Sequence, residues 1–194
     1  MKDKVLIYFL ILIGLWYVGC MIFRKNHYMN CKKMVTEHLK FLRKEDGHWK
    51  KIEFFNFFLI PLVIAIVLVL YNIQIDDKMA ETILVIMSIL LSTFFMIITV
   101  VLSFKNPVDA DRTYSAMEYD NIKNLIGAVT NAIIFEIFIS IIIVLLSFLI
   151  VFTKQVSIIQ SICSFLSFYL ILVMVLNLFI VLRSFSALVR VFIK

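Results

Sequence analysis

The 194-residue chain is poor in the residues that break helices, with only four glycines and two prolines. Glycine adds conformational freedom and proline removes a backbone donor, so long continuous helices contain few of either. Cysteine is equally scarce. Cys20, Cys31 and Cys163 are too few and too scattered for a disulfide framework. These shortages argue against a disulfide-stabilised scaffold and favour long, uninterrupted helices.

Charged residues are also scarce, at 16% of the chain, whereas hydrophobic residues make up 63%. A soluble domain is roughly 45–50% apolar. The longest polar stretch, residues 24–53, is shorter than the roughly 40 residues that an unaided domain needs. A separate soluble core is therefore excluded, and we expect a single integral membrane domain over residues 1–194.

Five long apolar runs account for this hydrophobic excess. A hydrocarbon core of about 30 Å takes about 20 helical residues to cross, and each run is near that length or longer. Within lipid, every backbone N–H and C=O must be paired inside its own segment. We therefore expect an all-α polytopic membrane bundle with five transmembrane helices, at residues 5–23, 54–75, 82–104, 125–152 and 156–182.

The distribution of Lys and Arg predicts the orientation of these helices. If all five runs span, residues 24–53, 105–124 and 183–194 share one side and hold fifteen of the 19 basic residues. The basic side is normally cytoplasmic. We therefore expect a multi-pass protein of the bacterial inner membrane with its N-terminus outside. An alternative is that Lys2, Lys4 and the run ending at Cys20 form a lipoprotein signal, although Tyr17 fits that pattern poorly.

The loop at residues 24–53 is predicted to form a basic, amphipathic cytoplasmic helix. We expect its cations to contact anionic phospholipids or an acidic cytoplasmic protein; they include Lys32, Lys33, Lys40, Arg43 and Lys44. Nucleic-acid binding is not expected, because the loop contains no recognisable module. His27, Cys31 and His38 would share one helix face and could hold a metal with a ligand from another subunit. The simpler interpretation is an amphipathic surface, so we expect no metal site.

The connections between the runs predict how the helices continue. Pro61 should kink the second helix, and residues 74–78 should form a short external turn that pairs the second and third helices as an antiparallel hairpin. Asn106 and Pro107 are typical of a helix start, which predicts one helix from about 107 to 152 with a cytoplasmic extension over 105–124. After an external turn at 153–155, the last helix could continue into the tail. Its apolar stripe would then lie along the inner leaflet, formed by Phe185, Leu188, Val189 and Phe192.

Catalysis has little support, since the chain has no Gly-rich phosphate loop, no metalloprotease helix motif and no Ser/His/Asp set at one membrane depth. We expect no catalytic residue and no cofactor. Glu136 is the only charged residue inside an apolar run, and Ser140 and Ser147 share its helix face; Asn177 lies deep in the last run. These four residues are candidates for an ion pathway or for helix packing.

Two interpretations of Glu136 remain open at this stage. Intramembrane acids usually face a bundle interior or water. In an oligomer, one Glu136 per subunit could form an acidic ring that favours cations. Alternatively, because its helix is longer than the bilayer, Glu136 could reach the cytoplasmic interface.

Hydroxyl side chains recur at helical spacing in two further runs. Such residues usually mark close helix packing. Their number indicates extensive helix–helix contact, including contact between subunits of a homo-oligomer. They are Ser88, Ser92, Thr99 and Ser103 in the third run, and Ser157, Ser161, Ser164 and Ser167 in the fifth.

One stretch resembles a known group of proteins. The third run, followed by Phe104-Lys105-Asn106-Pro107-Val108-Asp109-Ala110 and then by Tyr114, Ala116, Tyr119 and Ile122, is similar to the SLATT families of small bacterial membrane effectors. The resemblance covers about 70 residues and implies pore formation in anti-phage systems. The chain departs from that pattern by adding one helix before the pair and two after it. Its overall format is also similar to the membrane subunit of Kiwa-type defence systems, which implies a soluble partner.

These observations predict a non-enzymatic membrane component of a bacterial defence or stress system. It would self-associate, and it would either perturb the membrane or anchor or sense for a cytoplasmic protein partner. Two alternatives come from other classes of protein. One is a transport-complex subunit or bacteriocin immunity protein, and the other is a membrane-embedded lipid enzyme.

Overall fold

The computed structural model describes residues 55–103, 116–152 and 157–193, and every regular element in these ranges is helical. The elements in chain order are η2 (Phe55–Leu59), α4 (Ile60–Leu70), α5 (Asp77–Ser103), α7 (Ala116–Phe152) and α8 (Ser157–Ile193). The all-α prediction is confirmed for these ranges. The predicted helix at 5–23, the basic loop at 24–53 and the turn at 153–155 lie outside the described residues, as does the start of the extension predicted from 105.

Three of these helices are long and apolar enough to cross a membrane: Asp77–Ser103, Tyr119–Phe152 and Ile158–Arg190. They coincide with the predicted runs at 82–104, 125–152 and 156–182. The prediction of a helical membrane protein is therefore confirmed for three possible spans among the described residues. The run at 54–75 forms a shorter apolar helix, Phe55–Leu70, whose sixteen residues rise about 24 Å.

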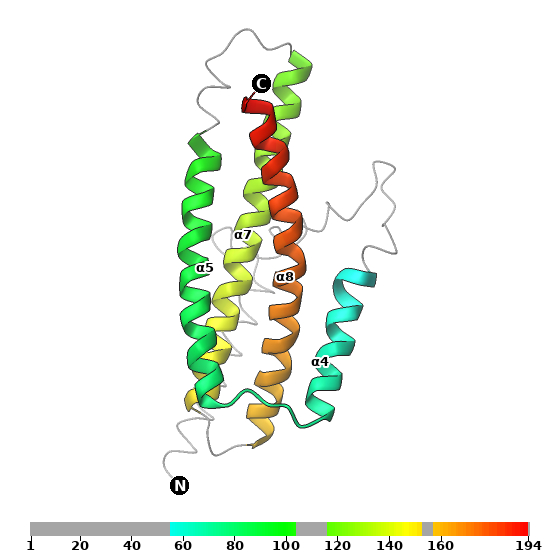
Figure 1. Ribbon diagram of the computed structural model, residues 1–194, viewed down its shortest axis with the longest axis vertical. Coiled ribbons are helices and arrows are strands. Elements are labelled where there is room, and N and C mark those ends of the chain that lie inside the picture. The colour runs from blue at the N-terminus through cyan, green and yellow to red at the C-terminus, as the bar shows by residue number, and fades with distance from the viewer. Residues whose placement is uncertain (1–54, 104–115, 153–156, 194) are drawn as a thin grey trace, which may run out of the picture.

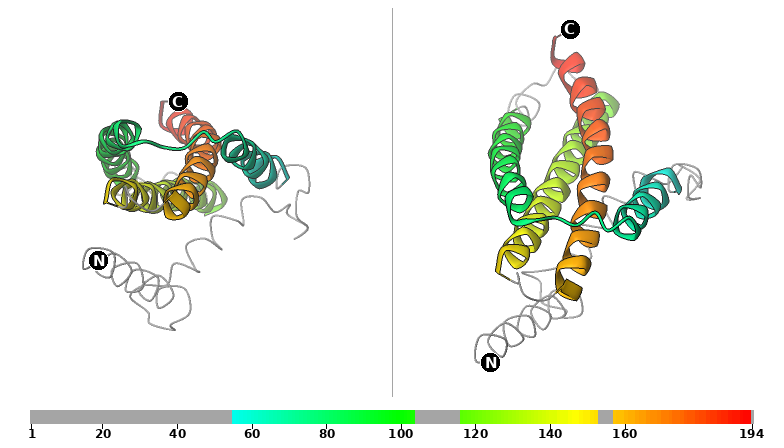
Figure 2. Two further views of the ribbon diagram at one scale, coloured as in Figure 1. Left: turned by 90° about the horizontal axis from the view of Figure 1, so that it is seen from below. Right: turned by 60° about the horizontal axis from the view of Figure 1, so that its bottom comes forward.

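The long helices form a bundle with α7 in the middle (Figure 1). α5 packs against one side of α7 and α8 against the other, while α4 packs on α8. The view from below shows α4 on the side of α8 away from α5 (Figure 2). The predicted hairpin of the second and third helices is therefore wrong in its packing, because α8 occupies the space between α4 and α5.

α4 ends in a Schellman motif, which opens the linker to α5 at residues 71–76. The N–H of Asn72 donates to the carbonyl of Val69 and that of Ile73 to the carbonyl of Leu68. Asn72 takes the left-handed conformation that this motif requires, with φ of 57°, and asparagine tolerates it better than most residues do. The helix predicted over 54–75 is therefore shorter, and its last residues form this linker.

The linker at 71–76 crosses the beginning of α8 and is bound to it. The backbone N–H of Ile75 donates to Ser164 Oγ at 3.0 Å, and Gln160 Nε2 donates to the carbonyl of Ile75 at 3.1 Å. Gln74 Nε2 also donates to Ser161 Oγ at 2.8 Å. Ile75 itself is fully buried. Two of the serines predicted to mark helix packing therefore bind the α4–α5 linker.

The α4–α5 linker is long enough to pass α8 and ends in a hydrogen bond at the start of α5. The four residues after the Schellman motif, 73–76, reach about 13 Å when extended, which is enough to pass a helix of 10–12 Å diameter. At the far end, Asp76 Oδ1 accepts a hydrogen bond of 2.8 Å from the N–H of Met79 and so caps the start of α5.

Pro61 is the second residue of α4 and lies six residues after the start of the apolar helix Phe55–Leu70. The five residues before α4 form the π-helical segment η2. A proline is tolerated in the first turn of an α-helix because its missing N–H would be unpaired there in any case. A change of helix type thus occurs just before Pro61, and the kink expected there stays a prediction.

α7 and α8 each contain 37 residues, or about 55 Å of helix, and so exceed a hydrocarbon core of about 30 Å by about 25 Å. Beyond the length that a hydrocarbon core would cover, α7 and α8 remain packed against each other. Leu188 near the end of α8 is fully buried in a cluster with Ile122 and Ile126 of α7. The predicted position of the C-terminal stripe along the inner leaflet is therefore wrong for Leu188, because α7 covers it.

Nine of the buried positions of α7 follow a coiled-coil-like repeat, whereas Ala132, Phe135 and Ile139 are buried beside it. The spacing of these nine positions alternates between four and three residues for four heptads, the period at which one helix stripe stays against a partner. The stripe consists of Ile122, Ile126, Val129, Ile133, Glu136, Ser140, Ile143, Ser147 and Ile150. It is aliphatic at both ends, and between Glu136 and Ser147 three of its four residues are polar: Glu136, Ser140 and Ser147, with Ile143 among them.

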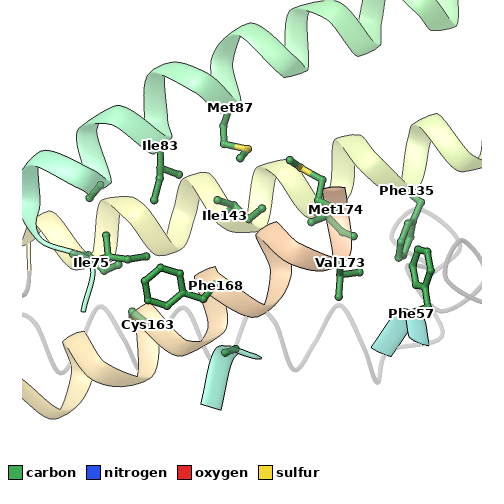
Figure 3. Packing of buried hydrophobic residues seen from close by; sticks show 14 residues of the cluster. Phe57, Ile75, Ile83, Met87, Phe135, Ile143, Cys163, Phe168, Val173 and Met174 are labelled. Carbon is green, nitrogen blue, oxygen red and sulfur yellow. The ribbon is translucent and has the colours of Figure 1, made fainter. Parts of the chain in front are cut away.

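The rest of the core is apolar and draws on all the described helices. Figure 3 shows Ile83 and Met87 of α5 directed toward Ile143 of α7, with Met174 of α8 nearby. The same view shows Phe57 of η2 beside Phe135 of α7. The polar side chains of α7 and α8 are therefore enclosed by aliphatic and aromatic groups.

Candidate functional site

Glu136 and Asn177 form the centre of the candidate site. Asn177 Nδ2 of α8 donates a hydrogen bond of 2.5 Å to Glu136 Oε1 of α7. Both side chains have no exposed surface. Two polar residues predicted from separate runs, 41 positions apart, are thus brought into direct contact between two antiparallel helices.

Ser140 lies one helical turn from Glu136 and belongs to the same site. Its Oγ donates to the backbone carbonyl of Glu136 at 2.8 Å and approaches Met174 Sδ at 3.5 Å. Met174 is not among the residues predicted for this site from the sequence. Its position three residues before Asn177, on the same face of α8, is the signal that could have identified it. We call Glu136, Ser140, Met174 and Asn177 the Glu136–Asn177 site.

Two oxygens of this site have no hydrogen-bond partner among the residues that the structure describes. They are Glu136 Oε2 and Asn177 Oδ1, and both are buried. Burying a polar atom without a partner costs about 1–3 kcal/mol, and more for a charged group. Because each residue has one oxygen without a partner, the pair can bind one further hydrogen-bond donor or a cation.

Nothing near Glu136 supplies a compensating charge. The carboxyl makes no ion pair within the part of the chain that the structure describes, because Asn177 is its one side-chain partner there. Glu136 lies sixteen residues before the end of α7 at Phe152, or about 24 Å of helical rise. It therefore lies within the length that a hydrocarbon core would cover if that core began at Phe152.

This placement bears on both interpretations of Glu136. The side chain is directed between α7 and α8 and does not reach the protein surface, so it does not extend to an interface. An acidic ring about a shared axis would need Glu136 on the outside of each subunit. In this arrangement such a ring could form only if α7 and α8 separated.

Ser147, the remaining candidate, lies in the same buried stripe but outside this contact. It is fully buried eleven residues after Glu136, and its Oγ has no partner. Ser167 of α8 is also fully buried with an unpartnered Oγ. Small polar side chains therefore occur along the α7–α8 contact from the Glu136–Asn177 site toward the linker at 71–76.

The hydroxyl stripe of α5 does not pack within the subunit. All four of its side chains are exposed, and each donates to a carbonyl three or four residues earlier in α5: Ser88, Ser92, Thr99 and Ser103. The face of α5 that contacts α7 is instead apolar, with Met87 and Phe94 buried. The stripe is therefore free to meet lipid or another subunit.

Several predicted contact residues lie outside the described residues. They include the basic set Lys32, Lys33, Lys40, Arg43 and Lys44, and the possible metal ligands His27, Cys31 and His38. Among the residues that the structure does describe, no group of three or more His, Cys, Asp or Glu side chains could hold a metal ion. The Glu136–Asn177 site has one carboxylate, one amide, one hydroxyl and one thioether.

Comparison with models of protein families, with curated proteins and with solved structures finds no match to this chain. The function is therefore argued from the residues and their geometry.

Proposed function

We propose that this chain is a non-enzymatic, self-associating component of the bacterial inner membrane, acting in a defence or stress system. It would perturb the bilayer or hold a cytoplasmic partner at it. The main support for self-association is the row of exposed hydroxyl side chains on α5, formed by Ser88, Ser92, Thr99 and Ser103. Defence is suggested by the resemblance of about 70 residues, from the second apolar run to the start of the fourth, to small bacterial membrane effectors. Partner binding is suggested by the basic loop at 24–53.

α5 is the least buried of the three long helices. Only 17% of its most apolar stretch is buried, compared with 44% for α7 and 33% for α8. Because the hydroxyls of Ser88 and Ser92 are already bonded to their own helix, they would contribute to association through small size and close helix approach. A helix that met only lipid would gain nothing from such a stripe, which supports a subunit contact through α5.

Cysteine cross-linking in membranes tests this contact. With Cys20, Cys31 and Cys163 replaced by serine, Ser88→Cys and Ser92→Cys should each form a covalent dimer on oxidation, because a small-residue contact brings two α5 helices within disulfide reach. The yield is read as the dimer fraction on a denaturing gel.

Ile86→Cys is the matched control for this experiment. Ile86 is 48% exposed, but it lies about 160° around α5 from Ser88. It should give several-fold less dimer than Ser88→Cys. Equal yields at the two positions would indicate random collision and would remove the argument for self-association through α5.

The proposed topology has five crossings, with the N-terminus outside and the C-terminus in the cytoplasm. Three helices long enough to cross support it, and so does the placement of fifteen basic residues on one side. With this orientation the linker at 71–76 faces outward. The extended ends of α7 and α8 then project into the cytoplasm, on the side of the membrane where the basic loop is predicted.

Impermeant thiol reagents on intact cells test this orientation. In a chain without native cysteines, Asp77→Cys and Lys154→Cys should react from outside, whereas Lys40→Cys should react only after the cells are opened. Labelling of Lys40→Cys together with protection of Asp77→Cys would invert the proposal and favour a cleaved or inward N-terminus.

A further inference from the structure

The Glu136–Asn177 site contains a carboxyl and a carboxamide, and in each group only one of the two polar atoms takes part in the hydrogen bond between them. One bond, from Asn177 Nδ2 to Glu136 Oε1, joins them. The other oxygen of each group, Glu136 Oε2 and Asn177 Oδ1, is buried without a partner. An ionised carboxylate can only accept, and so can an amide oxygen, so neither atom can satisfy the other in that state.

A single proton on the Glu136 carboxyl would give both of these oxygens a hydrogen bond, Glu136 Oε2 as the donor atom and Asn177 Oδ1 as the acceptor. A protonated carboxyl has one O–H donor, and the amide oxygen needs one donor. A carboxylic acid and a primary amide are both planar and can form two parallel hydrogen bonds in a closed ring. The bond already present between Nδ2 and Oε1 would be one side of that ring, and Oε2–H to Oδ1 would be the other.

The surroundings favour the neutral form. Transfer of an isolated carboxylate into an apolar environment is so unfavourable that such groups usually neutralise. Around Glu136, α7 contributes Ala132, Ile133 and Phe135, and α8 contributes Met174 beside Asn177, all buried. None of these side chains is titratable or positively charged.

The titratable groups of every helix packed here are remote or face outward. On α7, Lys123 is exposed and lies thirteen residues away; on α8, Arg183 is exposed and lies six residues beyond Asn177. The titratable groups of α5 are confined to its first five residues, and η2 and α4 have none. The described part of the chain therefore provides no cation for an ionised Glu136.

We propose that the α7–α8 contact contains a proton-binding site, in which Glu136 is held as the neutral acid and its Oε2–H donates to Asn177 Oδ1. This goes beyond the proposed function and does not depend on self-association through α5. Loss of the proton would leave a negative charge and two unpaired acceptor atoms, Glu136 Oε2 and Asn177 Oδ1, between two helices. Occupancy of the site by a proton therefore controls how closely α7 and α8 can pack.

Infrared spectroscopy of the full-length protein in lipid vesicles at neutral pH tests the proposal. The C=O stretch of a protonated carboxyl should be present, and it should be lost in Glu136→Gln, which keeps the shape of the side chain. Glu81→Gln is the matched control: Glu81 is exposed, so its substitution should leave the band unchanged. A wild-type spectrum with carboxylate bands only would overturn the proposal.

Two further measurements keep the test independent of any single variant. Asn177→Leu should retain the acid band and shift it to higher frequency, because the carboxyl loses the Nδ2 donor. The wild-type band should also be the same in sodium and choline buffers. Loss of the band in sodium would show that a metal cation, and not a proton, occupies the two free oxygens, and so would overturn the proposal.

Discussion

Replacing Asn177 with leucine is expected to weaken the pairing of α7 and α8 by about 1–3 kcal/mol. Leucine has the branched shape of asparagine but no polar atoms. Glu136 would lose its only side-chain donor within the described residues and would remain buried. The expected loss is the free-energy cost of leaving the buried Glu136 carboxyl without its donor. This cost is larger than the net stabilisation that one intact hydrogen bond provides.

Adding Glu136→Met to Asn177→Leu should restore most of this loss. Replacing both members of a buried polar pair by apolar groups of similar shape is often nearly neutral, whereas removing one member is not. The two single variants and the double variant form a double-mutant cycle, because the residues are in direct contact. A double variant that is no more stable than Asn177→Leu would show that the pair is not an isolated unit.

Cys163 provides a native reporter for this cycle. It is 6% exposed in α8, so its thiol should react only when the bundle opens. With Cys20 and Cys31 replaced by serine, Asn177→Leu should raise the labelling rate in mild detergent roughly 5- to 150-fold, which corresponds to about 1–3 kcal/mol. Asn131→Leu is the matched control. It makes the same chemical change at an exposed position of α7 and should leave the rate unchanged.

Truncation of Ile75 to alanine is expected to have the second large effect, about 2–5 kcal/mol, because a fully buried side chain is removed and a cavity remains. Ile75 anchors the α4–α5 linker on α8, and its backbone N–H and C=O bond Ser164 and Gln160. Loss of this anchor should release α4 and the start of α5 together. It should therefore increase labelling of Cys163, which belongs to the same buried cluster.

Ile73→Ala separates anchoring from a general change in the linker. Ile73 lies two residues earlier and is 47% exposed. Its truncation should change stability by less than about 0.5 kcal/mol. Similar labelling rates in Ile73→Ala and Ile75→Ala would show that the linker does not hold α8.

Hydropathy was enough to locate the long helices but not their ends. The run predicted at 156–182 becomes α8 (Ser157–Ile193), and that at 125–152 lies inside α7 (Ala116–Phe152). A hydropathy pattern marks the residues that prefer lipid. The helices continue because α7 and α8 cover each other beyond the apolar run, through contacts such as Leu188 with Ile122. The continuations themselves have local signals, because Asn106 and Pro107 predict a helix that begins near 107 and the apolar stripe of the tail allows the last helix to continue. What the sequence does not predict is that these two ends, more than 60 residues apart, cover each other.

The Glu136–Asn177 site could be predicted in part. Glu136 was evident as the only charge inside an apolar run, and Ser140 followed from helical spacing. Their contact with Asn177 could not be predicted, because the relative height and rotation of two helices are set by their packing. The same reason explains why the hydroxyls of Ser88 and Ser92 lie outside the subunit whereas those of Ser161 and Ser164 bind the linker. Spacing identifies a helix face but not what covers that face.

The α4–α5 linker also constrains the order in which the protein can be assembled. Its three bonds to α8 join residues 85 to 89 positions apart in the sequence. At a synthesis rate of about 5–20 residues per second, α8 emerges roughly 4–18 s after the linker that receives it. During that interval the N–H and C=O of Ile75 need water as a partner. A position at the membrane surface is therefore a requirement for biogenesis, and α4 can dock only after the last helix has been made.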